Sequence, residues 1–68
     1  MNEEKFNIEV RKFLKKVGIN SQREIEQAVR AAIASGALTG DESLTVTATL
    51  EIGDLSLSER IDGRINLE

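Results

Sequence analysis

Apolar positions along the chain follow two different periods, and the period changes once, between Leu38 and Ser43. Before this change, apolar residues recur every three or four positions, as side chains on one face of an α-helix do. These residues are Phe6, Val10, Phe13, Leu14, Val17, Ile25, Ala28, Val29, Ala32 and Ile33. After it, apolar residues alternate with polar ones, which is typical of a β-strand with one covered face. These residues are Leu44, Val46, Ala48, Leu50, Ile52, Leu57, Ile61, Ile65 and Leu67.

Local signals divide the helical half into two helices, the first over about residues 3–17. Asn2 can cap its start, because an Asn side chain accepts a hydrogen bond from a free N–H of the first turn. Gly18 stands where a helix commonly ends in a left-handed residue, and Ile19 can fold back onto the last turn. The sequence therefore predicts that this helix ends at Val17.

A second helix is expected over about residues 22–35. Ser21 and Glu24 have the S-x-x-E spacing of a capping box, directly before Ile25 begins the second apolar stripe. Gly36 is the natural stop. Because so few residues join the two helices, we expect them to pack side by side, roughly antiparallel.

The alternating half predicts an antiparallel hairpin with strands over about residues 44–52 and 59–67. The favoured register places small residues opposite each other inside. It pairs Leu44 with Leu67, Val46 with Ile65, Ala48 with Gly63, and Leu50 with Ile61. The alternative register, displaced by two residues, places Leu50 opposite Glu59 on the covered face, where a carboxylate would lose its water.

Together these elements predict one α+β domain over residues 1–68, with two antiparallel helices packed on one face of a two-stranded antiparallel hairpin. About twenty apolar side chains are then expected to form a single core. A two-stranded sheet leaves both of its edges open. We therefore expect pairing with a second copy at a strand edge, giving a homodimer, or binding of another protein.

The amino-acid composition excludes most kinds of catalytic site. The 68 residues include no cysteine and no histidine, so disulfides, zinc sites and nucleophiles activated by histidine are excluded. The remaining carboxylates Glu51 and Asp62 are expected on the polar outer face of the hairpin, near Arg60 and Arg64, where solvated ion pairs are the favoured interpretation. We expect no enzyme, no cofactor, and no catalytic or metal-binding residue.

Charge suggests one rival function. Residues 1–36 carry seven Lys/Arg and five Asp/Glu, whereas residues 37–68 carry two and seven, so the helical half is basic and the chain is acidic overall, with a net charge of −3. A nucleic-acid contact through the basic residues of the helices is the alternative hypothesis, although phosphate binding requires a strongly basic face. The candidate residues are Arg11, Lys12, Lys15, Lys16 and Arg23.

The segment 13–29 also resembles a helix-turn-helix motif, since Phe13, Val17 and Ile19 occupy its apolar positions and Gly18 its glycine. Two positions depart from the motif. Leu14 stands where a small residue is usual, and Glu24 where the second helix needs an apolar one. A third helix is also missing, so this interpretation is the less favoured.

The run from Phe13 to Glu26, FLKKVGINSQREIE, resembles a family of short uncharacterised bacterial proteins with a helix–helix–strand–strand outline. The resemblance covers almost the whole chain and implies a bacterial protein without an assigned activity. It carries no functional residues. With no secretory signal and no apolar run of about 20 residues, we expect a cytoplasmic protein that acts as an interaction module.

Overall fold

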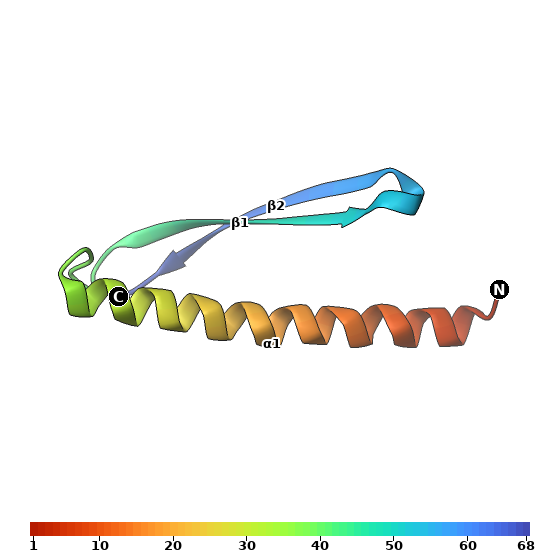
Figure 1. The fold of residues 1–68 in the computed structure, drawn as a ribbon, viewed down its shortest axis with the longest axis horizontal. Helices are drawn as coiled ribbons and strands as arrows, with labels where there is room; N and C mark the ends of the chain where they lie inside the picture. The colour runs from red at the N-terminus through yellow and green to blue at the C-terminus, as the bar shows by residue number, and fades with distance from the viewer. The chain divides into compact units, whose positions relative to one another are not determined.

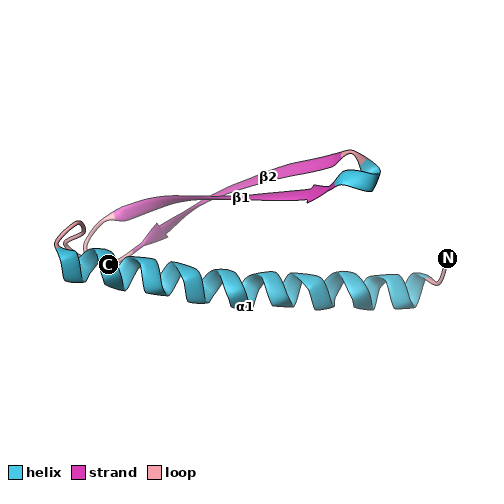
Figure 2. Ribbon diagram, in the orientation of Figure 1, coloured by secondary structure: helices cyan, strands magenta, loops and turns pink.

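A computed structural model describes all residues, 1–68, and it has a helix followed by a β-hairpin (Figures 1 and 2). This confirms the α+β class and the two-stranded antiparallel hairpin. The chain divides into two compact units, Met1–Ala37 and Leu38–Glu68, and each is described by itself. The elements, in chain order, are α1 (Glu3–Ser35), β1 (Ser43–Ile52), the short 3₁₀ helix η1 (Gly53–Leu55) and β2 (Leu57–Asn66).

The first unit is a single helix of 33 residues, so the prediction of two helices was wrong. Phe6, Val17 and Ala28 lie on one face of the continuous helix because they are spaced eleven residues apart, whereas Val29 and Ile33 of the second stripe lie about 140° and 180° around the helix from Phe6. Eleven residues make about three turns, so the face is kept throughout. A break would leave several backbone groups of each new helix end without intrahelical partners. A glycine inside the helix costs only about 1 kcal/mol relative to alanine.

Both outer ends of α1 are capped as the sequence predicted. The Asn2 side chain accepts a hydrogen bond from the backbone N–H of Lys5 at 3.0 Å. Gly36 adopts the left-handed conformation, with φ of 84°, and its N–H bonds to the carbonyl of Ile33 at 3.2 Å. The expected capping box is absent, because Ser21 and Glu24 both lie inside the continuous helix.

The hairpin has the register that the sequence analysis rejected. β1 and β2 pair Leu44 with Ile65 and Leu50 with Glu59, so the predicted register was wrong by two residues. The strand bounds are close to the predicted ones: β1 ends at Ile52 as predicted, and β2 begins at Leu57 instead of residue 59. The strands run right up to a short connection formed by η1 and Ser56, which adopts a left-handed conformation with φ of 51°. The two strands cross in Figure 1, as expected for a twisted two-stranded ribbon.

The observed register was expected to be unfavourable because the Glu59 carboxylate would lose its water, but this desolvation penalty does not arise. Its carboxylate is exposed and keeps its water, and Ile61 on the same strand is 59% exposed. The observed register also gives the hairpin a tighter connection and places Val46 over Gly63, where a Cβ would lie 3.4 Å from the valine Cγ1. A shorter connection costs less entropy to close.

No side chain in the structure is buried, polar or apolar, so neither unit by itself holds a core of about twenty residues. Leu55, at the end of η1, is 70% exposed. The half-buried apolar side chains are Ile25, Val29, Ala32, Leu38, Leu44, Val46, Leu50, Ile65 and Leu67. Despite its length, α1 is not apolar enough to cross a lipid bilayer.

The continuous helix predicts opposite effects of alanine at two glycines. Gly18→Ala should stabilise the protein by about 1 kcal/mol, because alanine is the better helix former and no other atom lies within 4 Å of the added Cβ. Gly36→Ala should destabilise it by about 1–2 kcal/mol, because a Cβ is strained at a left-handed position. Chemical unfolding followed by far-UV circular dichroism measures both changes, and destabilisation by Gly18→Ala would show that the helix ends there.

Candidate functional site

The largest candidate site is one long face of α1 that we call the α1 apolar face. Its nine residues share one side of the helix: Phe6, Val10, Phe13, Leu14, Val17, Ser21, Ile25, Ala28 and Ala32. Phe6 is 49% exposed, and Phe13 and Leu14 are each 52% exposed. The large residues stand mainly in the first half of the helix and the small ones in the second. Contiguous exposed apolar surface of this kind is typical of a binding site.

The sequence analysis identified most of these residues but assigned them to a closed core. It missed Ser21 as a member of the face, because Ser21 was interpreted as a cap. The spacing of eleven residues across Gly18, from Leu14 to Ile25, was the signal that could have shown one uninterrupted face.

The five candidate nucleic-acid contacts all lie on α1 and are exposed. They lie within one arc of about 140° around the helix, in the order Arg11, Lys15, Lys12, Arg23 and Lys16, since successive residues are about 100° apart. The helix-turn-helix interpretation was wrong, because residues 18–21 continue the helix and form no turn.

Two shallow depressions follow the surface of α1, and each is lined by that helix alone. The first is lined by Ile19, Gln22, Arg23, Glu26, Gln27 and Arg30, and the second by Glu9, Lys12, Phe13 and Lys16. In the first, Arg30 Nη2 lies 3.9 Å from Glu26 Oε2, an ion pair typical of residues four positions apart on a helix. With all but one of these side chains exposed, neither depression can enclose a small ligand.

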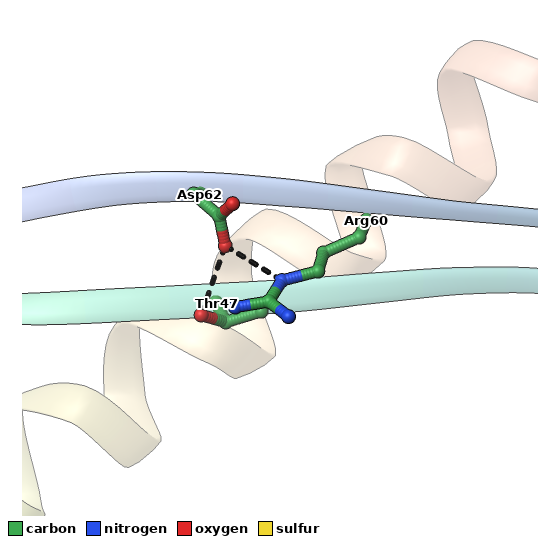
Figure 3. A network of polar contacts seen from close by, with 3 residues as sticks. All are labelled: Thr47, Arg60 and Asp62. Atoms are coloured by element: carbon green, nitrogen blue, oxygen red, sulfur yellow. Dashed lines mark hydrogen bonds and ion pairs between the residues drawn. The ribbon is translucent and has the colours of Figure 1, made fainter.

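The outer face of the hairpin holds a polar network of three residues (Figure 3). Asp62 Oδ1 accepts hydrogen bonds from Arg60 Nε at 2.9 Å and from the Thr47 hydroxyl at 3.1 Å. Glu51 pairs with Ser58 in the observed register, and Asp62 pairs with Thr47, so the two carboxylates are four positions apart along the hairpin. They do not form an acid–base pair, and the arrangement is a surface network that stabilises strand pairing.

The connection between α1 and β1 is organised by the Glu42 carboxylate. It accepts the backbone N–H groups of Thr39 at 2.8 Å and of Gly40 at 3.0 Å, and the Thr39 hydroxyl at 3.0 Å. The N–H of Thr39, and then that of Gly40, lower the pKa of Glu42 from 4.5 to about 2. Glu42 is therefore a turn-forming residue. The chain contains no group of three or more acidic residues placed to hold a metal ion.

The fold and the site define a small α+β protein whose principal surface feature is an exposed apolar helix face. The chain belongs to the DUF6494 family, a family of unknown function, whose model matches residues 1–68. This confirms the resemblance to a family of uncharacterised proteins; a bacterial origin stays a prediction. No curated protein and no solved structure matches the chain.

The Glu42 turn predicts a specific pH dependence. Because the carboxylate is hydrogen-bonded in the folded state, its stabilising effect should be complete above pH 4.5 and be lost as the pH falls through about 2. Glu42→Gln should therefore be less stable than the unmodified protein at neutral pH, and the difference should shrink in acid. An NMR titration of the Glu42 carboxyl carbon gives the pKa directly. A midpoint near 4.5 would contradict the turn geometry.

Proposed function

We propose that this protein is a non-enzymatic interaction module that binds a protein partner through the α1 apolar face. The observation that carries the proposal is that no apolar side chain in the structure is buried, even though the helix bears a continuous apolar stripe. Contact between water and such a stripe is unfavourable, so a partner surface that covers the stripe and displaces this water should bind to it.

Element lengths support this proposal independently. A helix of 33 residues is about 50 Å long, whereas a strand of 10 residues is about 33 Å long. A hairpin made from such strands cannot cover the full length of the helix in any arrangement. Roughly a third of the helix, about 11 residues, must find another partner for its apolar residues.

The low stability expected for an isolated helix and for an isolated hairpin also supports binding to a partner. Most of the stability of a helix in a protein comes from packing of its apolar face, and a two-stranded hairpin alone is at best marginally stable in water. Burying a large apolar side chain such as Phe6 or Phe13 contributes about 1.5–3 kcal/mol. Association would supply this burial, which the isolated chain lacks.

Two other surfaces have weaker support. The outer edges of β1 and β2 are unpaired, but β2 carries Glu59, Arg60, Asp62 and Arg64, and charged edge strands resist pairing. A nucleic-acid contact through the basic residues of α1 stays the alternative prediction, with weaker support because the chain is acidic overall, with a net charge of −3. The cytoplasmic location expected from the sequence stays part of this proposal.

Paired substitutions on opposite sides of α1 test the proposal. Val10→Asp places a charge in the apolar face, and Ile8→Asp places the same charge on the opposite side, where Ile8 is 56% exposed. Sedimentation velocity over a range of concentrations should show a species larger than the monomer for the unmodified protein. Val10→Asp should abolish it, and Ile8→Asp should leave it intact.

Chemical cross-linking in a cell lysate covers a partner other than the protein itself. There, Val10→Asp should remove a cross-linked product that Ile8→Asp retains. The proposal would be overturned if the unmodified protein stayed monomeric at every concentration and formed no cross-linked product that Val10→Asp removes. Equal loss of association by both variants would also contradict it, since binding would then not depend on the α1 apolar face.

A further inference from the structure

We infer that the partner of the α1 apolar face is a second copy of the chain, with the two helices antiparallel and crossing near Ile19. This inference rests on the proposed function and identifies its partner. Ile19 is the midpoint of α1, which runs from Glu3 to Ser35. In an antiparallel pair centred there, residues equally distant from Ile19 lie opposite each other.

The sizes of the side chains on the face are complementary under this symmetry. The first half of the helix presents Phe6, Val10 and Phe13, whereas the second half presents mostly alanine and serine. Three of the five opposed pairs place a large residue against a small one, which helps keep the distance between two helices even along their length: Phe6 with Ala32, Val10 with Ala28, and Val17 with Ser21. The other two are Phe13 with Ile25, both large, and Leu14 with Glu24, whose carboxylate must reach water at the edge of the contact.

A parallel pair would place like residues together. Phe6 and Phe13 would meet their own copies at one end, and Ala28 and Ala32 theirs at the other, so the helices would be forced apart at one end or leave a gap at the other. Both orientations are compatible with two-fold symmetry; in the antiparallel pair residue i of one copy contacts j of its partner and j contacts i.

Charge favours the same orientation. From Glu3 to Gly18 the helix carries five basic and three acidic residues, whereas from Asn20 to Ser35 it carries two of each. A parallel pair would bring the two positive halves together. An antiparallel pair places each positive half beside a neutral one, which reduces like-charge repulsion.

The second half of the face is partly exposed. Ala28 and Ser21 are exposed in the structure, while Ile25 and Ala32 beside them are half-buried. Val10 and Ala28 are eighteen residues apart, which is about five full turns, so both point in the same direction from the helix axis. They are therefore the best pair for a test of orientation.

Disulfide trapping provides that test, because the chain has no cysteine of its own. Val10→Cys and Ala28→Cys are made as separate single variants, mixed, refolded together and oxidised mildly. The antiparallel pair predicts the mixed disulfide between the two variants in clear excess over either homodisulfide, as measured by mass spectrometry. The matched control is Lys16→Cys mixed with Gln22→Cys. These positions are also equally distant from Ile19 but lie away from the α1 apolar face, so they should give no such excess.

The remaining outcomes separate this inference from the proposed function. If Val10→Cys alone formed its homodisulfide as readily as the mixed one, the pair would be parallel; the inference would fall, and docking through the α1 apolar face would stand. If no mixture exceeded the Lys16/Gln22 control, self-pairing would be refuted. A lysate cross-link that Val10→Asp removes would then still support binding of a different protein.

Discussion

The exposure of the apolar face of α1 is the constraint on which the rest of this structure depends. A chain of 68 residues is near the lower limit for independent folding, and here it divides its apolar residues between a helix and a hairpin without burying any of them. Conformational entropy opposes folding by about 1–2 kcal/mol for each ordered backbone residue. The chain has no cysteine for a disulfide, and in the proposed association the compensating free energy comes from apolar surface that leaves water when copies or partners bind.

The long helix and its function have the same origin. Continuing through Gly18 keeps Phe6, Val17 and Ala28 on one side, and this produces a face too long for a ten-residue hairpin to cover. Two shorter helices could instead have packed against each other and against the hairpin to close a small core. The continuous helix leaves this face exposed, and in the proposed self-association the change from large to small side chains along it sets the orientation of the two copies.

Sequence periodicity predicted the α+β class, the caps at Asn2 and Gly36, and the hairpin, because each depends on short-range chemistry. It wrongly predicted a break between two helices at Gly18–Ser21. Local capping signals indicated a helix end there, whereas the eleven-residue spacing of apolar residues, which is longer than a capping motif, indicated one continuous helix. It also chose the wrong hairpin register, since the penalty assigned to Glu59 assumed a buried face. Both errors came from the assumption that the apolar residues pack against each other within one chain. Local sequence patterns cannot establish such packing.

The dependence of thermal stability on protein concentration tests the link between folding and association most directly. When only an associated species is folded, the midpoint of unfolding rises with total protein concentration, because mass action favours the assembly. The structure predicts such a rise in circular-dichroism melting curves recorded from dilute to concentrated protein. A cooperative transition with the same midpoint at every concentration would contradict it, since a monomer would then be stable without covering its apolar helix face.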